Sequence, residues 1–439
     1  NVSGNVDYCP WLDAPYPGGN AVGPVQNINT GEYFCTIQDA INAANDGDII
    51  VVHDGIYREK VIIDREITLI NGSKPVIDGM GGIGISIEAN NVTIDGFNIT
   101  NSSYGIWCSA SGFVIKNNTF WYDDWGFYWD IEESPVSDYT IYDGIVEGNE
   151  FYMDEDNDAT YIYIDIDYGG DGPYDATIGN ITIWNNTFYM NGTTATGIDM
   201  SGGIYVYDLY GGNISMGTVN ISNNKIYGGD YGIYFYGYFD DLTDVSVSVG
   251  DFIINENIML NQSSYAIYLD YYDAEYWDGS TTGVFGDLII NDNTIESDDA
   301  YGIYISDYAY WEYFYDNASL ITGDICIEGN EIEVEDDAIY LYYSYGAYEF
   351  DNNASVVMGN VYINDNIIYD SSCGIYIDME EFEDMYENAT AIMGFINISN
   401  NEINANEEGI YFYAYGLGYY IEDNTSIAVS YTHLTLPTN

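Results

Sequence analysis

Residues 323–343, GDICIEGNEIEVEDDAIYLYY, decide the fold, because their pattern recurs about every 36 residues. Three marks follow in fixed order: a glycine (Gly323), an asparagine seven residues later (Asn330), and an Ile-Tyr pair that ends at Tyr340. The Gly-to-Asn interval never changes, whereas the return from the tyrosine to the next glycine varies from 12 to 19 residues. This combination predicts a solenoid, since stacked strands must keep register while loops may grow. The repeat glycines are Gly179, Gly217, Gly250, Gly286, Gly323, Gly359 and Gly394.

Apolar residues alternate on both sides of these marks. Residues 324–327 and 361–363 show the period of two that is typical of short strands. The same alternation around Tyr304 predicts that isoleucines point into an aliphatic core and tyrosines point outward. The tyrosines are Tyr234, Tyr268, Tyr304, Tyr340, Tyr376 and Tyr411, with Tyr205 as a looser first copy.

The recurring asparagines are interpreted as structural. An asparagine at each bend can satisfy backbone groups that a corner leaves unpaired, and its carboxamide can bond to its copy one rung away, roughly 4.8 Å off. We therefore predict a buried ladder and no catalytic role for it. Its members are Asn186, Asn224, Asn257, Asn293, Asn330, Asn366 and Asn401.

Rungs upstream are shorter, because Asn98 and Asn118 are twenty residues apart. The later repeats carry about fifteen extra residues between tyrosine and glycine, in arms rich in Tyr and acid such as 306–322 and 378–393. Two interpretations stay open at this point. The arms either project from the coil or enlarge the rung.

The start of the coil has a recognisable pattern. Thr36 can cap a helix and has an acid three residues later, and Ile37, Ala40 and Ile41 share one face. This pattern predicts a short capping helix over 36–44. Strands follow at 47–52, 60–63 and 67–70. Residues 36–70 and the VTIDGFNIT of 92–100 resemble NosD-like and pectate-lyase-like proteins, and the resemblance covers roughly 33–120 by motif and the rest by repeat. This resemblance implies an all-β, right-handed parallel β-helix of the kind found in large archaeal or bacterial surface proteins.

The spacing of the repeat also indicates how the chain is divided. Residues 1–19 resemble the end of a preceding domain or a linker, and 20–428 form one coil with short rungs to about 120, an irregular part at 120–175, and long repeats at 176–428. The sequon spacing predicts a glycine at position 430, which is Ser430. The tail 429–439 resembles a translated sequencing adapter and is expected to lie outside the fold, with a natural tail as the alternative. We expect a fragment that lacks sequence at both ends.

Charge limits the partners. The net charge is −66 with only six basic residues, which makes nucleic acid and anionic membranes poor partners, and we expect no direct membrane insertion. Cations are expected to screen the surface. A halophilic source is one explanation and bound Ca²⁺ is the other, since carboxylates suit hard cations. No other cofactor is predicted.

N-glycosylation is predicted from the arrangement of sequons, although an Asn-rich chain makes some by chance. Sequons recur six residues before the repeat glycine, and others fall on outward strand positions. The predicted acceptors are Asn220, Asn317, Asn353, Asn388, Asn397 and Asn424.

Five cysteines show no paired metal spacing, which argues against zinc. Cys9 and Cys35 flank the start of the coil and are predicted as a disulfide, with free thiols as the alternative.

Catalysis is weighed against a structural role. After Lys225 the chain offers no Lys or Arg for a lyase base, and His53 is the one histidine before the tail. Lys116 and Lys225 remain as candidate bases, with isolated surface charges as the favoured interpretation. An inverting glycosidase needs only two carboxylates. However, pairs such as Asp298-Asp299 and Asp336-Asp337 recur with the repeat, so they indicate a ladder. The irregular stretch 120–175, with Asp123-Asp124 and several tryptophans, is the enzyme candidate. The favoured interpretation is a degenerate rung around Asn149 with a long loop of exposed aromatics.

The outward tyrosines allow three interpretations: sugar stacking, a contact face between chains, or shielding of the strands. Together with the acidic charge and the sequons, they favour an extracellular cell-surface glycoprotein with a structural or adhesive role. Glycans or neighbouring copies are the expected partners. The alternative is a polysaccharide-active enzyme or a carbohydrate-binding module.

Overall fold

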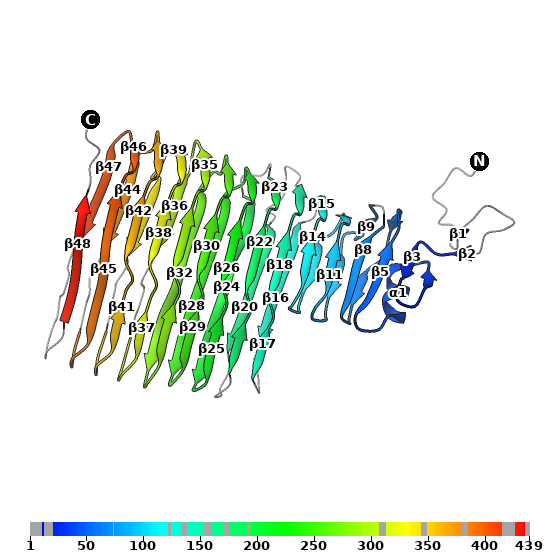
Figure 1. Cartoon of the computed structure of the whole chain (residues 1–439), viewed down its shortest axis with the longest axis horizontal. Coiled ribbons are helices and arrows are strands. Elements are labelled where there is room, and N and C mark those ends of the chain that lie inside the picture. The colour runs from blue at the N-terminus through cyan, green and yellow to red at the C-terminus, as the bar shows by residue number, and fades with distance from the viewer. Residues whose placement is uncertain are drawn as a thin grey trace.

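The computed structural model describes residues 11–12, 21–72, 74–121, 124–133, 138–152, 160–169, 175–190, 194–306, 313–343, 349–379, 385–414 and 426–434. Over these residues the chain coils into a long stack of rungs with a short helix at its N-terminal end (Figure 1). The predicted all-β solenoid is confirmed.

Each rung gives one strand to each of three sheets that run along the stack and pair in parallel, rung to rung. Sheet I contains β5 (Asp48–Val52), β8 (Ile67–Asn71), β11 (Thr93–Asp95), β14 (Val114–Lys116), β18 (Gly144–Glu147), β22 (Ile181–Trp184), β26 (Val219–Ser222), β30 (Phe252–Asn255), β34 (Leu288–Asn291), β38 (Ile325–Glu328) and β42 (Val361–Asn364). Sheet II contains β6 (Ile56–Tyr57), β9 (Val76–Asp78), β12 (Asn98–Thr100), β15 (Thr119–Trp121), β19 (Glu150–Tyr152), β23 (Thr187–Tyr189), β27 (Lys225–Tyr227), β31 (Ile258–Leu260), β35 (Thr294–Ser297), β39 (Glu331–Val334), β43 (Ile367–Tyr369) and β46 (Glu402–Asn404). Sheet III contains β7 (Val61–Ile63), β10 (Ile83–Ile87), β13 (Tyr104–Cys108), β16 (Trp125–Glu133), β20 (Thr160–Gly169), β24 (Thr196–Tyr210), β28 (Tyr231–Thr243), β32 (Tyr265–Asp278), β36 (Tyr301–Ser306), β40 (Ile339–Tyr343), β44 (Cys373–Met379) and β47 (Glu408–Ala414).

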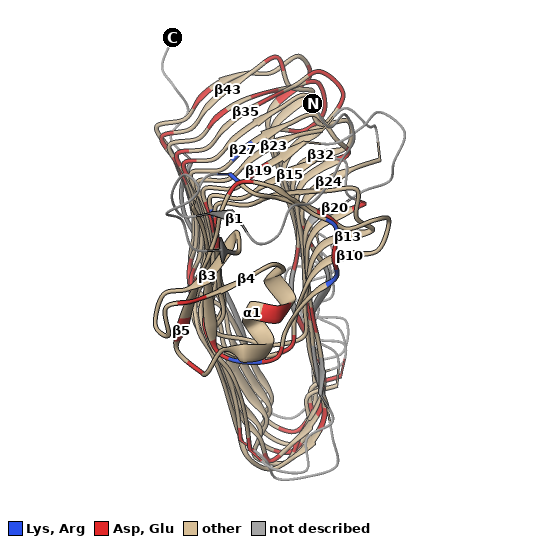
Figure 2. Cartoon of the chain, turned by 90° about the vertical axis from the view of Figure 1, so that its right-hand side faces the viewer, with Lys and Arg blue, Asp and Glu red and all other residues tan. Residues whose placement is uncertain are grey.

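A further set of parallel strands, here called the added ladder, begins where the rungs lengthen. It consists of β17 (Tyr139–Ile141), β21 (Ala176–Ile178), β25 (Asn213–Met216), β29 (Ser246–Val249), β33 (Thr282–Phe285), β37 (Ser319–Ile321), β41 (Ser355–Val357) and the first part of β45 (Thr390–Ser399), whose second part continues sheet I. Buried residues of this ladder, such as Val247 and Leu320, extend the core. The arms therefore enlarge the rung. Figure 2 shows the result, a small ring around α1 in front of a much taller one.

The pairing corrects two sequence-based alignments. Asn98 lies opposite Thr119, so the short rung has a 21-residue offset and Asn118 is not the copy of Asn98. Tyr205 pairs with Tyr238, whereas the residue beside Tyr234 is Asp199. The copy of Tyr234 is thus an aspartate, and Tyr205 lies further along the strand, beyond a register shift between Met200 and Ile204.

The inward and outward sides are as predicted. Ile303 and Ile305 are fully buried, whereas Tyr304 between them is partly exposed on the outer face of sheet III. The core is a continuous stack of such residues, and within it Phe120, Phe151 and Phe188 stack face to face on successive rungs. Alternation with period two is thus what orients every long strand.

Helix α1 (Ile37–Ala43) caps the N-terminal end of the coil, packed against β3 (Val25–Asn27) and β4 (Glu32–Phe34). Thr36 is its N-cap, and the Thr36 hydroxyl oxygen accepts the Asp39 N–H at 3.0 Å. Glu59, from the following rung, accepts the N–H groups of Ile37 and Gln38 at 2.9 and 3.0 Å. Burial raises the pKa of the Glu59 carboxyl.

We predict that Glu59→Ala lowers the free energy of unfolding by about 1–2 kcal/mol, because two N–H groups at the helix start lose their acceptor. Urea titration followed by circular dichroism measures this change. Glu32→Ala, at an exposed carboxylate, is the matched control and should change stability little. Equal effects of the two substitutions would contradict the capping role.

At the two ends, β1 (Trp11–Leu12) pairs antiparallel with β2 (Ala21–Val22), and β48 (Ser426–Leu434) lies beside β45. The β45–β48 pairing keeps an offset of 36 through Ala428, and its register shifts after that residue. The native or foreign origin of 429–439 stays a prediction. Cys9 and Asn424 lie outside the described residues, so the predicted disulfide with Cys35 and that sequon also stay predictions.

Candidate functional site

The ladder asparagines lie buried at the turn between sheets I and II. The Asn330 N–H and Nδ2 both donate to Asn366 Oδ1 at 2.9 Å, and Nδ2 also donates to the Ile290 carbonyl at 2.8 Å. The same bonds recur from rung to rung, which satisfies the backbone at the corner without water. The residues joined in this way are Asn118, Asn149, Asn186, Asn224, Asn257, Asn293, Asn330, Asn366 and Asn401.

Asn118 and Asn149 extend the ladder beyond its seven predicted members, and Asn149 lies in the rung that was interpreted as degenerate. The residue seven before Asn149 is Tyr142, where the repeat would have glycine. The detectable signal is the apolar residue two positions after each asparagine, Phe120 and Phe151, both of which are buried.

Close approach of neighbouring rungs explains the glycines. A Cβ on Gly359 would lie 2.0 Å from the Gly323 carbonyl oxygen, and a Cβ on Gly394 would lie 2.2 Å from that of Gly359. Tyr142 stands at this position in the first tall rung, where no added strand lies beneath it, and its side chain is 49% exposed. The glycine is therefore required by contact with the preceding rung.

The residue after each repeat glycine forms a second ladder. Asp287 N–H donates to Asp251 Oδ1 at 3.0 Å, and Asp324 N–H donates to Asp287 Oδ1 at 2.8 Å. Asn360 N–H continues the series to Asp324 Oδ1 at 2.6 Å. These carboxylates cap backbone groups of the next rung, so their recurrence has a structural cause.

Tyrosines form stacked columns on the outer surface. From Tyr268 through Tyr304 and Tyr340 to Tyr376 and Tyr411, successive ring centroids are 5.4, 4.5, 4.7 and 4.7 Å apart. A second column on sheet II contains Trp121, Tyr152, Tyr189 and Tyr227. Cross-rung stacking of this kind stabilises parallel strands. Burial raises the pKa of Tyr234 to about 12, with a smaller contribution from Asp270, so that phenol stays neutral at pH 7.

Acidic side chains between the tyrosines make the coil sensitive to pH. Burial, with the neighbouring carboxylate Asp241, raises the pKa of Asp240 to about 6. A folded-state pKa above the unfolded value means that the folded chain holds the proton more tightly. The contribution of Asp240 to the free energy of unfolding therefore rises as pH falls from about 7 to about 4.

We predict that Asp240→Asn raises the melting temperature at pH 7.5 and changes it less at pH 4.5, since the native side chain is then already protonated. The variant keeps the oxygen that accepts the Asp241 N–H. Differential scanning calorimetry across this range measures the effect, with Glu335→Gln at an exposed carboxylate as control. A gain at pH 7.5 that persists unchanged at pH 4.5 would exclude titration of Asp240 as the cause.

The irregular stretch, our enzyme candidate, is where the coil widens. Trp129 is fully buried; its Nε1–H donates to the Ala110 carbonyl at 2.9 Å, and its ring meets Phe113 edge to face at 4.8 Å. This tryptophan closes the core at the step between short and tall rungs. The alternative of exposed aromatics is wrong for Trp129, whereas Trp121 and Trp125 are partly exposed.

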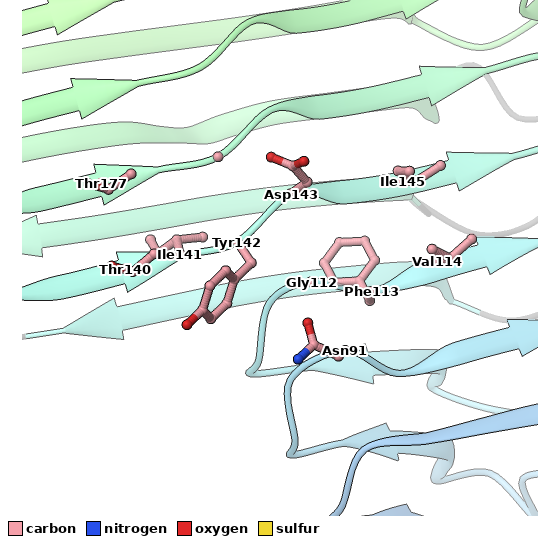
Figure 3. A pocket seen from close by; sticks show the side chains of 11 residues that line it. Asn91, Gly112, Phe113, Val114, Thr140, Ile141, Tyr142, Asp143, Ile145 and Thr177 are labelled. Carbon is pink, nitrogen blue, oxygen red and sulfur yellow. The ribbon is translucent and has the colours of Figure 1, made fainter. Parts of the chain in front are cut away.

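A surface hollow of about 390 Å³ lies at the same step (Figure 3). The Tyr142 ring, the Asp143 carboxylate and the Asn91 amide line it together with Phe113 and Gly112. Asp143 Oδ1 accepts the Asn180 N–H at 2.7 Å, which fixes the carboxylate. An aromatic ring beside fixed polar groups has the chemistry needed to hold a sugar ring.

The other catalytic candidates are scattered. Lys116 Nζ lies 3.6 Å from Asp95 Oδ2, and Lys225 is exposed on β27. Asp298 and Asp299 are exposed, whereas burial raises the pKa of Asp337, whose Oδ1 accepts the Cys373 N–H at 3.2 Å. Asp123 lies outside the described residues.

Among the described residues, no three His, Cys, Asp or Glu side chains are grouped to hold a metal ion. The calcium prediction is tested by calcium titration with thermal melting against matched ionic strength, because a specific ligand raises the melting temperature by mass action. No described helix is long and apolar enough to be a candidate membrane span.

The predicted glycosylation acceptors that the structure describes lie on the outside of the coil. Asn317, Asn353 and Asn388 are exposed at the turn before the added ladder, and their amides follow one another at 3.5 and 3.4 Å. Asn220 and Asn397 are partly exposed on the outer face of sheet I. Cys108 and Cys373 are buried free thiols and Cys326 is a partly exposed one.

Comparison with known proteins agrees with this architecture. Residues 64–248 match the family described as "Right handed beta helix region", and the fold is a right-handed parallel β-helix. A cell surface glycoprotein of the archaeon Methanothermus fervidus is 35% identical over 112 residues, which cover 24% of this chain and 19% of that protein. The chain is thus similar, over part of its length, to a protein of the cell surface.

Proposed function

We propose that the protein is an extracellular glycoprotein of the cell surface, in which the coil is a stiff structural or adhesive element. The observation that carries this proposal is the unbroken asparagine ladder from Asn118 to Asn401, which repeats one set of side chains on every rung. This buried ladder holds successive rungs in one register, so the outer side chains above it also repeat, which suits repeated contacts along a layer or fibre. The similarity to a cell surface glycoprotein supports the location.

Antibody labelling of intact and permeabilised cells tests the location. We expect equal labelling of the two samples, because the coil lies outside the cell. Labelling only after permeabilisation would reject the proposal. A cytoplasmic protein stained in parallel is the control for cell integrity.

A carbohydrate-binding role is the second candidate, and the hollow at Tyr142 is the observation that favours it. Tyr142→Ala removes the aromatic ring without touching either ladder. If a glycan array shows binding by the native protein, this variant should lose it, whereas Tyr189→Ala on sheet II should retain it. Turnover of the bound oligosaccharide would favour an enzyme over both roles.

A further inference from the structure

The outer face of the added ladder carries no charge over β25, β29, β33, β37, β41 and the first part of β45, in a chain with 72 acidic residues. Its outward side chains form two columns in register. The first column is Asn213, Ser246, Thr282, Ser319, Ser355 and Thr390, and the second is Ser215, Ser248, Val284, Ile321, Val357 and Ile392.

The second column becomes an exposed aliphatic stripe. Val284, Ile321 and Ile392 are 51%, 49% and 38% exposed, and Val357 between them is half-buried. Because they lie on consecutive rungs, the four side chains form one continuous apolar strip about 15 Å long. An apolar strip of this kind marks a surface that another group covers.

The sequons border the stripe. On β37, β41 and β45 the order along the chain is the same: an exposed asparagine just before the strand, the sequon hydroxyl in the first column, and the aliphatic residue in the second. From Asn317 to Ile321 the chain advances four residues, about 13 Å when extended. A short oligosaccharide attached to the asparagine can therefore reach the stripe.

We propose that N-linked carbohydrate on Asn317, Asn353 and Asn388 lies over the added ladder and covers the stripe of Val284, Ile321, Val357 and Ile392. This inference rests on the proposed function, since it needs a glycoprotein. The C–H faces of pyranose rings can pack on the aliphatic side chains, and the serine and threonine hydroxyls can bond to sugar hydroxyls. No charged group has to be desolvated, so coverage avoids the largest cost of burying polar surface.

One consequence is that carbohydrate lies on one side of the coil. The strands of sheet III contain no Asn-X-Ser/Thr sequence within their bounds, so the column from Tyr268 to Tyr411 stays uncovered. A second copy of this chain is the competing occupant of the stripe. Its net charge of −66 opposes that association, and the test below separates the two.

Hydroxyl-radical footprinting of the native glycosylated protein tests the proposal without a variant. Ile321 and Ile28 are 49% and 47% exposed, so without carbohydrate they should be oxidised at similar rates. We expect Ile321 and Ile392 to be oxidised several-fold more slowly than Ile28. Equal rates with all three asparagines glycosylated would overturn the proposal.

The triple variant Ser319→Ala, Ser355→Ala and Thr390→Ala gives the complementary test. It removes the three sequons and keeps Asn353 and Asn388, whose φ of 69° suits asparagine. We expect the rates at Ile321 and Ile392 to rise to that of Ile28, and an apolar dye to bind more strongly. Thr119→Ala, which removes the distant sequon at Asn117, should change neither quantity.

Three further outcomes contradict specific parts of the account. Protection that persists in the triple variant, with a dimer in sedimentation velocity, would assign the stripe to a second copy. Carbohydrate at other sequons but none at Asn317, Asn353 and Asn388 would overturn only this inference. Bare asparagines at every sequon would overturn the proposed glycoprotein as well.

Discussion

Asn330→Ala should lower the free energy of unfolding by about 3–5 kcal/mol, although it removes a single uncharged side chain. The Asn293 N–H and Nδ2 would lose their acceptor, and the Ile290 carbonyl would lose its donor. All of these groups are buried, so water cannot replace the lost bonds. Urea denaturation followed by circular dichroism gives the magnitude.

The position of the damage is as informative as its size. Since each rung contacts only its neighbours, hydrogen exchange should accelerate most in β34, β38 and β42, around the interrupted ladder. Asn404→Ala, at an exposed asparagine outside the ladder, should leave both quantities nearly unchanged. If the two substitutions cost the same, the ladder does not hold the turn.

Gly359→Ala should be at least as damaging, because the added methyl group meets backbone. Its Cβ would lie 2.0 Å from the Gly323 carbonyl oxygen and 2.3 Å from the carbonyl carbon. Neither atom can rotate away, so the rungs must separate and lose pairing between β38 and β42. We expect a loss above 4 kcal/mol, or uncoupling of the rungs that follow.

Gly409→Ala is the matched control for this prediction. A Cβ at Gly409 meets nothing within 4 Å, so the same chemical change should have little effect. Thermal melting of both variants against the native chain decides the question. A Gly359→Ala protein with native stability would show that the rungs do not approach as closely as described.

The repeat predicted the solenoid because backbone contact between rungs selects side chains directly. Gly323 and Asn330 recur since one must be small and the other must bond to its copy. The same physics explains why the repeat is degenerate at Asn149. Its rung is the first tall one, so no strand lies below Tyr142 to demand glycine, and the mark used for counting is absent.

Registers failed where the backbone itself is irregular. Asp199 occupies the copy of Tyr234, and the bulge after Met200 places Tyr205 beside Tyr238, which residue spacing alone cannot reveal. The arms were undecided for a related reason. Their apolar residues, such as Phe239 and Leu242, are buried in the structure, but this burial depends on the return of β29 beside its neighbours.

For the candidate site, the sequence identified the residues, whereas the structure showed on which face of the coil they lie. The sequons at Asn317, Asn353 and Asn388 were visible as a repeated spacing. Their position beside the uncharged stripe depends on pairing between strands more than thirty residues apart. The hollow at Tyr142 was not predicted, because it forms where short and tall rungs meet.

Site-resolved glycopeptide mass spectrometry of the protein from its native cells tests the central claim most directly. The account predicts carbohydrate at Asn317, Asn353 and Asn388, on the border of the added ladder, in a protein recovered from the cell surface. Peptides that cover these three asparagines and the other sequons and are all unmodified would contradict it.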